Sequence, residues 1–292
     1  MLQYKRVGLT LKRALTGREA VVSQVLTILR DLGAKVFVDA SHTEGIACVE
    51  GLPKLEKPED IDLLLVIGGD GTILRAVREI AGCAIPILSV NRGAVGFLAE
   101  TNVDEADELV PKLLSGEGII EERHLLKVVA ERDGEQIFEG LALNEAVIAQ
   151  GAIARLLTLR TSIGEEVLTT YHADGIIIAT PTGSTAYSLA AGGPVVHPSL
   201  SAIIVTPINP HSFSQRPIVV PAGSPVAIEV IKADDPYRHS EVSLTLDGQV
   251  YQPLKRLDRV TVSVHSDTVK FVRRRQDTFY STLRTKLKWG ER

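Results

Sequence analysis

Residues 61–72 read IDLLLVIGGDGT, a continuous apolar run that leads directly into a glycine-rich turn. An apolar run such as 61–67 predicts a strand that is buried on both faces of a parallel sheet. Helical spacing begins near Ile73, so the stretch predicts a strand, a glycine turn and a helix in succession. This succession is typical of a doubly wound α/β unit.

The segments on either side repeat the alternation of strand and helix. Residues 5–11 and 34–40 are predicted strands, and between them apolar residues recur at helical spacing from Arg18 to Leu32, before Gly33. The apolar residues 85–90 predict another strand. Residues 102–114 predict a helix whose acidic first turns suit the helix dipole. The first part of the chain is therefore predicted to be α/β.

From about residue 122 the pattern changes to short alternating strands with little helical periodicity. Glycine-containing turn signals recur there, which predicts a mostly-β domain: Asp133-Gly134, Ile163-Gly164, Pro221-Ala222-Gly223 and Asp247-Gly248.

Residues 275–292 recover helical spacing, so the chain is predicted to end in a helix. The basic residues of this end are expected to form a solvated helix face; they are Lys270, Arg273, Arg274, Arg275, Arg284, Lys286 and Lys288.

Length, charge and cysteine usage narrow the class of protein. A chain of 292 residues is long enough for about two domains. Its net charge is −4, whereas a general nucleic-acid binder carries an excess of basic residues. Cys48 and Cys83 show neither disulfide nor zinc spacing. Without an apolar leader or a membrane-length apolar run, we expect a cytoplasmic protein with no nucleic acid and no membrane as partner.

The motif Gly68-Gly69-Asp70-Gly71-Thr72 lies between the predicted buried strand and helix. Backbone N–H groups at such a junction can bind phosphate, and glycine lets a ligand approach closely. A carboxylate beside phosphate is repulsive unless it accepts a proton or faces a metal, so Asp70 suggests phosphoryl transfer to a hydroxyl. The alternative is a tight turn in which Asp70 caps the helix. Neither the P-loop pattern nor G-x-G-x-x-G after the first strand is present.

A second dense stretch, DGIIIATPTGSTAYSLAAGGP, covers residues 174–194. A predicted strand, 176–179, opens into a run of hydroxyls that suits ribose or phosphate but also suits plain helix capping. Ser184 lacks the G-x-S-x-G setting of a nucleophile. The histidines show no metal-ligand spacing, so no protein-held metal is expected.

Seven stretches together resemble the bacterial NAD kinases, the ATP-NAD kinase family. GGDGT alone is a weak signal, because phosphofructokinases and lipid kinases carry versions of it, whereas TPTGSTAYSLAAGGP is far more specific. The resemblance covers nearly the whole chain: GGDGT at 68–72, NRGAVGFLAE at 91–100, Asn144-Glu145, DGIIIATPTGSTAYSLAAGGPVVHP at 174–198, PINPHSFSQRPIVVP at 207–221, Asp247-Gly248-Gln249 and LRTKLKWG at 283–290.

The resemblance implies an enzyme that uses ATP to phosphorylate the 2′-hydroxyl of the adenosine ribose of NAD, giving NADP. It implies a Rossmann-like α/β domain of residues 1–121 plus 273–292, a β-rich NAD-binding domain of residues 122–272, and a C-terminal helix that returns to the α/β domain. Mg²⁺ or Mn²⁺ is expected to arrive with ATP. Family members form homodimers or homotetramers in which a neighbouring subunit supplies residues near the nicotinamide.

The same resemblance assigns the site residues. Asp70 is the expected proton acceptor, Gly71 and Arg75 are expected near the phosphates, and Asn144 and Glu145 match the pair that binds ribose hydroxyls. Phe97 and Tyr187 match the adenine pocket, although core packing is the alternative for both. Further ligand positions are Thr185, Ala186 and Ser188 at the adenosine, His172 and Asp174 at the nicotinamide end, and Arg155 and Gln249.

The sequence leaves open the role of one residue and two alternative functions. Many relatives have Arg where this chain has His172, which is equally consistent with a surface histidine. A lipid kinase would share the GGDGT loop, but the Asn-Glu pair and TAYSLAAGG argue against it. A non-catalytic NAD-binding sensor would have no need of Asp70. The sequence leaves open NAD against NADH, ATP against polyphosphate, and feedback by NADPH.

Overall fold

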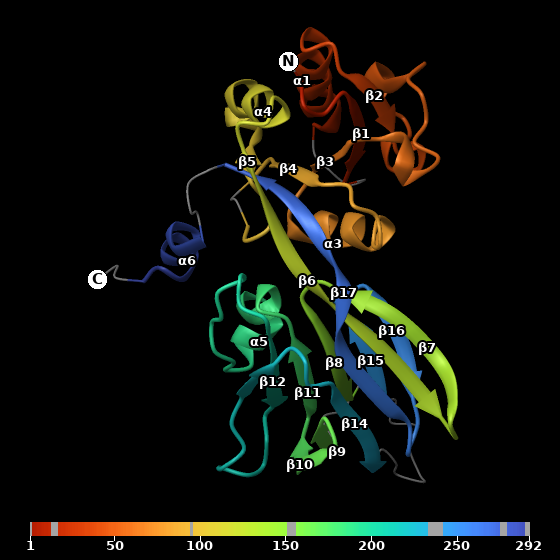
Figure 1. The fold of residues 1–292 in the computed structure, drawn as a ribbon, viewed down its shortest axis with the longest axis vertical. Helices are drawn as coiled ribbons and strands as arrows, with labels where there is room; N and C mark the ends of the chain where they lie inside the picture. The colour runs from red at the N-terminus through yellow and green to blue at the C-terminus, as the bar shows by residue number, and fades with distance from the viewer. Residues whose placement is uncertain are drawn as a thin grey trace. The chain divides into compact units, whose positions relative to one another are not determined.

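The chain forms two compact units in the computed structural model, which describes residues 2–12, 17–93, 96–150, 156–232, 242–274 and 279–289. Unit 1 comprises residues 1–122 and 269–292, and unit 2 comprises residues 123–268 (Figure 1). The chain passes between the units inside two long strands, β6 (Ile119–Arg132) and β17 (Arg259–Arg273).

Unit 1 is built on a parallel sheet with the strand order β2-β1-β3-β4. The register pairs Val7 with Leu63 and Leu64 with Ile87. All five residues of β3 are buried, which confirms the two-sided burial predicted from the apolar run. The strands are β1 (Arg6–Leu11), β2 (Lys35–Val38), β3 (Leu63–Ile67), β4 (Ile87–Asn91) and the short β5 (Thr101–Asn102), which pairs with β4.

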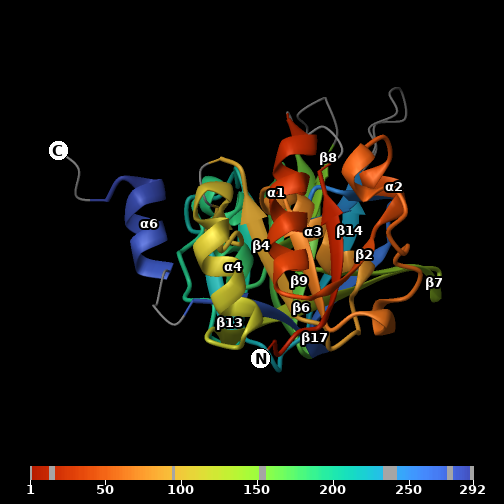
Figure 2. The same ribbon diagram turned by 90° about the horizontal axis from the view of Figure 1, so that it is seen from above.

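Helices cover both faces of this sheet, as a doubly wound unit requires. Helices α1 and α4 lie side by side on one face, and α3 lies on the other (Figures 1 and 2). Alternate strand residues such as Leu9, Leu65 and Val90 form one apolar core with α1 and α4. The helical segments are α1 (Arg18–Asp31), α2 (Ala40–Thr43), η1 (Ala47–Val49), η2 (Pro58–Asp60), α3 (Asp70–Glu79), η3 (Val103–Glu105) and α4 (Ala106–Leu114).

The C-terminal helix α6 (Phe279–Leu287) belongs to unit 1. The ring of Phe279 lies 6.5 Å from the ring of Phe97, and Leu283 is buried. The expectation that the basic residues near this end line a solvated helix face is wrong for Lys270 and Arg273, which belong to β17. It is also wrong for Arg274, which follows β17 outside any helix and pairs with Glu100, and Arg275 lies outside the described residues. Arg273 is only 7% exposed, because it is paired with acidic residues inside unit 1.

Unit 2 is mostly β, as predicted, and consists of two antiparallel layers. One layer has the order β10-β9-β14-β17, with β6 beside β17 and β7 beside β6. The other has the order β13-β12-β11-β8-β15-β16. The strands are β7 (Glu135–Ala142), β8 (Glu145–Gln150), β9 (Leu157–Ile163), β10 (Glu166–Ala173), β11 (Gly175–Ala179), β12 (Ala202–Ile208), β13 (Ile218–Pro221), β14 (Val226–Lys232), β15 (Val242–Leu246) and β16 (Val250–Leu254).

The core of unit 2 lies between these layers and is built from every second residue of their strands. Ile176 and Ile178 contribute from β11, and Ile228 and Val230 contribute from β14. The intervening residue Ile177 faces the other side of β11, in a small apolar cluster covered by the segment that follows. That segment contains η4 (Thr182–Thr185) and α5 (Tyr187–Ala190).

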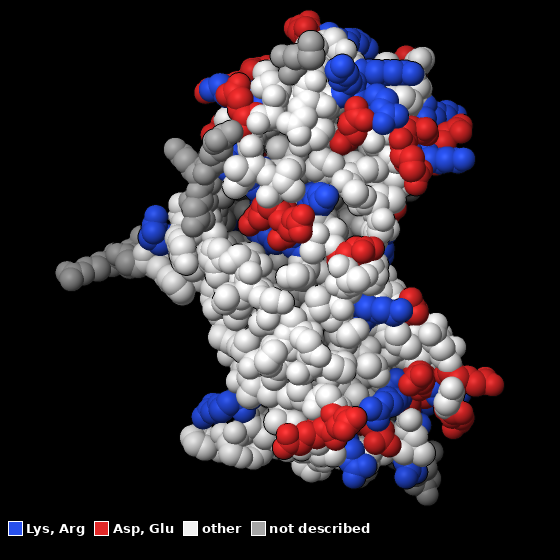
Figure 3. All heavy atoms as spheres, in the orientation of Figure 1, with Lys and Arg blue, Asp and Glu red and all other residues white. Residues whose placement is uncertain are grey.

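Charged side chains of both signs are interspersed over the face drawn in Figure 3, except over α5 and β12, where few are seen. Within the described ranges, no helix is both long and apolar enough to cross a membrane.

Candidate active site

The glycine-rich loop joins the end of β3 to the start of α3. A Cβ on Gly68 would lie 2.5 Å from Oγ1 of Thr72, so only glycine leaves room for the turn. Gly69 is the N-cap of α3 and Asp70 is its first residue. Gly71 is exposed, and a Cβ there would meet open space. The loop thus has the strand, turn and helix geometry that the sequence predicted.

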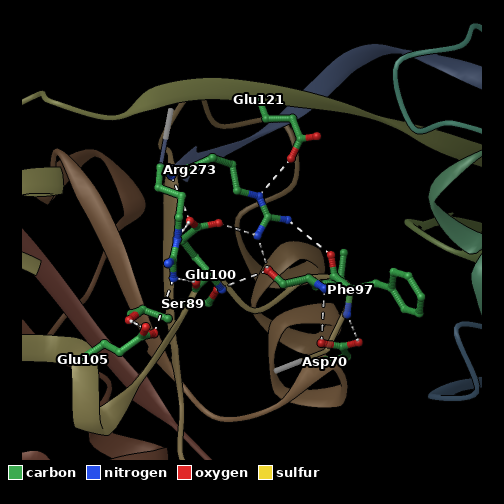
Figure 4. A network of polar contacts seen from close by, with 10 residues as sticks. Asp70, Ser89, Phe97, Glu100, Glu105, Glu121 and Arg273 are labelled. Carbon is green, nitrogen blue, oxygen red and sulfur yellow. Dashed lines mark hydrogen bonds and ion pairs between the residues drawn. The ribbon is translucent and has the colours of Figure 1, made fainter. Parts of the chain in front are cut away.

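The carboxylate of Asp70 is held by a second loop, residues 96–100, rather than by its own helix. The N–H of Phe97 donates to Oδ2 at 3.1 Å and the N–H of Leu98 donates to Oδ1 at 3.3 Å (Figure 4). A Cβ on Gly96 would overlap this carboxylate, so Gly96 makes the approach possible. The alternative in which Asp70 merely caps α3 is wrong, because Gly69 occupies that position.

These two bonds leave Asp70 in a defined orientation with acceptor capacity to spare, since a carboxylate offers about four lone-pair positions. Ser89 of β4 steadies the loop: its hydroxyl donates to the carbonyl of Leu98 at 3.2 Å and accepts the N–H of Glu100 at 3.0 Å. The arrangement suits a group that accepts a proton from a positioned hydroxyl.

Two other predicted residues of unit 1 are engaged within the fold. The guanidinium of Arg75 donates to the hydroxyl of Thr10 at 2.9 Å and to the carbonyl of Leu11 at 3.3 Å, and it pairs with Glu79 at 3.1 Å. These contacts place Arg75 at the carboxyl end of β1, and its contact with phosphate stays a prediction. Phe97 is half-buried beside Phe279.

The Asn144-Glu145 pair lies at the start of β8, and both residues are buried. Asp247, in the turn between β15 and β16, fixes their backbone. Its Oδ1 accepts the N–H groups of Asn144 at 2.8 Å and Glu145 at 3.0 Å, and its Oδ2 accepts that of Leu143 at 2.9 Å. The sequence analysis noted Asp247 only as part of the Asp247-Gly248-Gln249 turn and did not predict that it holds the backbone of this pair.

The side chain of Glu145 is a buried carboxyl group whose ionisation is opposed by its surroundings. Burial, together with the nearby negative charge of Asp247, raises its pKa from 4.5 to about 8, although a hydrogen bond from the backbone of Tyr187 acts in the opposite direction. Its Oε2 is buried and has no hydrogen-bond partner among the described residues. A buried carboxyl group with an unpaired oxygen is a strong candidate for binding a ligand hydroxyl.

The turn after β11 packs directly against Asn144. Thr180 donates through its hydroxyl to the carbonyl of Leu143 at 2.6 Å and accepts the N–H of Gly183 at 3.0 Å. A Cβ on Gly183 would overlap the backbone of Asn144, so glycine is required for this approach. The register of β8 and β11, with Glu145 opposite Ala179, brings the pair and the hydroxyl-rich segment to the same end of the sheet.

The predicted adenosine contacts of this segment differ in exposure. Tyr187 is 46% exposed, so core packing does not account for it. Thr185 and Ala186 are both half-buried. The hydroxyl of Ser188 is fully buried and bonded to that of Thr206 at 2.9 Å.

His172 and Asp174 lie at the other end of β11 from Thr185 and Tyr187. The five-residue strand between them is about 16 Å long. Asp174 accepts a hydrogen bond from the side chain of Asn209 at 3.0 Å, and the exposed His172 ring lies 3.3 Å from the hydroxyl of Thr158. Gln249 is exposed in the turn that carries Asp247. Arg155 lies outside the described residues.

A cavity of about 600 Å³ in unit 1 contains none of the predicted site residues. It is lined by residues that precede the strands, among them Tyr4, Ile61 and Pro86, and so lies at the end of the parallel sheet opposite the glycine loop. Ligands of open α/β sheets bind at the carboxyl ends of the strands. Among the described side chains, no group of three His, Cys, Asp or Glu residues is placed to hold a metal ion.

Comparison with known proteins yields matches along nearly the whole chain. The family model for the ATP-NAD kinase N-terminal domain matches residues 18–118, and that for the ATP-NAD kinase C-terminal domain matches residues 143–274. The NAD kinase of Geobacter sulfurreducens is 42% identical over 94% of this chain and 95% of its own length. The NAD kinase of Solibacter usitatus is 39% identical over 99% of each chain.

Solved structures agree with these relatives. Yeast NADH kinase in complex with NADH superposes with a TM-score of 0.87 at 27% identity, over 99% of this chain and 89% of that one. An NAD kinase from Archaeoglobus fulgidus in complex with ATP has the same fold, with a TM-score of 0.74 at 24% identity over 97% of this chain and 98% of that one. With its glycine loop, its Asn-Glu pair and these full-length matches, the chain belongs to the ATP-NAD kinase family.

Proposed function

We propose that this protein transfers the γ-phosphoryl group of ATP to the 2′-hydroxyl of the adenosine ribose of NAD, giving NADP and ADP. Membership of a phosphotransferase family supports the reaction class. The observation that carries the proposal is the carboxylate of Asp70, which two backbone N–H groups fix at the glycine loop.

The proposed transfer is direct and in line. The ribose 2′-oxygen attacks the γ-phosphorus, the bond from this phosphorus to the departing ADP oxygen breaks, and the hydroxyl proton passes to Asp70. Gly71 offers a backbone that a phosphate can approach, because nothing lies within 4 Å of a Cβ built there. Mg²⁺ or Mn²⁺ would accompany ATP, bound through phosphate oxygens and water, and neutralise phosphate charge.

We further propose that Asn144 and Glu145 bind the ribose hydroxyls. The unpaired Oε2 of Glu145 supports this role, because a hydroxyl donating to it would satisfy a buried acceptor. Tyr187, with Thr185 and Ala186 beside it, offers an exposed aromatic face for the adenine.

The nicotinamide contacts of His172 and Asp174 are proposed to serve the site of a neighbouring copy in a homodimer or homotetramer. Their position at the far end of β11 from Tyr187 supports this assignment. The surface nearby carries the 90% exposed Phe213, and the area over α5 and β12 has few charged side chains (Figure 3). An exposed apolar surface of this kind is typical of an interface between protein chains.

The activity is tested with purified protein, Mg-ATP and NAD, by measuring NADP with an NADP-specific dehydrogenase. Asp70→Asn is expected to lower kcat by orders of magnitude while NAD binding, measured by calorimetry, changes little. Binding of NAD without NADP formation by the folded wild type would indicate a sensor, and polyphosphate would then be tested as the donor. A kcat within a few-fold of wild type in Asp70→Asn would exclude Asp70 as the base.

The interface is tested with Phe213→Ser. Sedimentation velocity is expected to show a smaller species than the wild-type oligomer, because a large exposed apolar side chain is lost. A wild type that sediments as a monomer at all concentrations would exclude the shared site.

A further inference from the structure

Arg273, the last residue of β17, holds the far side of the loop that binds Asp70. Its guanidinium donates from Nη1 to the carbonyl of Leu98 at 3.0 Å and from Nη2 to the carbonyl of Phe97 at 3.4 Å (Figure 4). These are the two residues whose N–H groups donate to the carboxylate of Asp70. All of these groups belong to unit 1.

The peptide group between Phe97 and Leu98 is therefore bonded on both of its edges. Its carbonyl accepts from Arg273, and its N–H donates to Oδ1 of Asp70 at 3.3 Å. Hydrogen bonds in series polarise one another, and a positively charged donor strengthens the next bond in the chain. A shift of the carbonyls would move the amides, and with them the carboxylate.

Two acids and the planar shape of the guanidinium fix Arg273 itself. Glu100 lies 3.1 Å from Nη1 and Glu121 lies 2.9 Å from Nε, so the donors are directed to four different acceptors. The side chain of Glu100 is 2% exposed, so its pairing with Arg273 is buried. An arginine can reach all four acceptors because its donors point in different directions from one rigid plane, whereas the donors of a lysine all lie on one nitrogen atom.

We propose that Arg273 is a positioning residue for the reaction: through the Phe97–Leu98 peptide it sets the orientation of the Asp70 carboxylate. This inference rests on the proposed role of Asp70 as proton acceptor. It gives the buried arginine at the end of β17 a function besides neutralising Glu100.

The adjacent Arg274 provides a matched control. It pairs with Oε1 of the same Glu100 at 2.9 Å and donates to the Glu100 carbonyl at 2.7 Å, with no bond to the carbonyls of Phe97 or Leu98 among those the structure defines. Arg273→Ala and Arg274→Ala therefore both weaken the anchoring of Glu100. Only the first removes the donors from the peptide that holds Asp70.

The experiment measures kcat and KM for Arg273→Ala, Arg273→Lys and Arg274→Ala, each alone and combined with Asp70→Asn. Arg273→Ala is expected to lower kcat by about 10- to 100-fold, the size of effect that misplacing a reacting group produces, with KM for NAD and ATP little changed. Arg273→Lys keeps a positive charge beside Glu100, so it should fold, but it should recover only part of kcat. Arg274→Ala should keep kcat.

The double variants separate positioning from general damage. If Arg273 acts through Asp70, Arg273→Ala adds little to the loss already caused by Asp70→Asn, whereas a structural defect would multiply it. A wild-type kcat in folded Arg273→Lys, equal losses in the two alanine variants, or multiplicative losses would each overturn the inference. Should Arg273→Ala not fold, Arg273→Lys alone decides through its kcat. Inactive wild type would instead overturn the proposed function.

Discussion

Replacing Glu145 by glutamine removes a carboxyl group whose ionisation the folded protein opposes. Burial and, second, the charge of Asp247 raise the pKa of this group from 4.5 to about 8, against an opposing hydrogen bond from the Tyr187 backbone. The folded state therefore holds the proton more tightly than the unfolded chain does. This contribution to stability is fully present below pH 4.5 and is lost as the pH rises through about 8.

The size of the effect follows from linkage. Each unit of difference in pKa corresponds to about 1.4 kcal/mol, so between pH 6 and pH 8 the wild type should lose about 2 kcal/mol of unfolding free energy relative to Glu145→Gln. The variant keeps the shape of the side chain but has nothing to titrate. It should also bind NAD more weakly. A carboxylate can accept a hydrogen bond from a ribose hydroxyl at each of its two oxygens, whereas an amide has only one acceptor oxygen.

The assay is urea unfolding of the wild type and Glu145→Gln at several pH values from 6 to 8. Glu166→Gln, which changes an exposed glutamate of β10, is the control for the loss of a carboxyl group as such. The difference between Glu145→Gln and wild type should widen steadily with pH, while that for Glu166→Gln should stay flat. A difference that does not change with pH would refute the assignment of a raised pKa to Glu145.

Three further predictions follow from the same structure. Gly96→Ala places a Cβ on the Asp70 carboxylate, so it should lower kcat strongly and the melting temperature only slightly; kinetic and thermal-unfolding measurements on the same variant check this. Asp258→Ala removes a fully buried carboxylate that pairs at 2.8 Å with the 31% exposed Arg132, and should destabilise the protein by about 1 to 3 kcal/mol in urea unfolding. NAD binding at neutral pH should release up to about one proton, because ribose hydroxyls favour the ionised form of Glu145, and titration calorimetry in buffers of different ionisation enthalpy would detect it.

The sequence predicted those elements whose signal is local. The apolar run at 61–67 contains β3, and the helical spacing from Arg18 to Leu32 corresponds to α1. Both could be predicted because burial of one face or of two faces determines which positions along the chain are apolar. Asp70 stood out for a chemical reason, because a carboxylate conflicts with a phosphate-binding turn. The family resemblance then supplied the Asn-Glu pair.

The groups that hold these residues were beyond local reasoning. Leu98 lies 28 positions from Asp70 and 175 positions from Arg273, and Asp247 lies 102 positions from the Glu145 amide that it accepts. Strand order brings these partners together, and no spacing in the sequence encodes it. Arg273 was misassigned for this reason. It lies among other basic residues in the sequence, so it was predicted to lie on a solvated helix face, whereas the pairing of β17 with β4 places it inside unit 1.

The carboxyl groups of Asp70 and Glu145 lie in different environments, which suit the two different roles proposed for them. Both oxygens of Asp70 already accept backbone N–H groups, so its orientation exists before any ligand arrives, which suits its proposed role as proton acceptor. Glu145 is buried with one oxygen unpaired, a state that opposes its ionisation until hydroxyls donate to it. In the proposed reaction, ribose binding would satisfy an acceptor that is unpaired in the free protein. The proposed transfer would depend instead on the Asp70 carboxylate, which the backbone already holds in position.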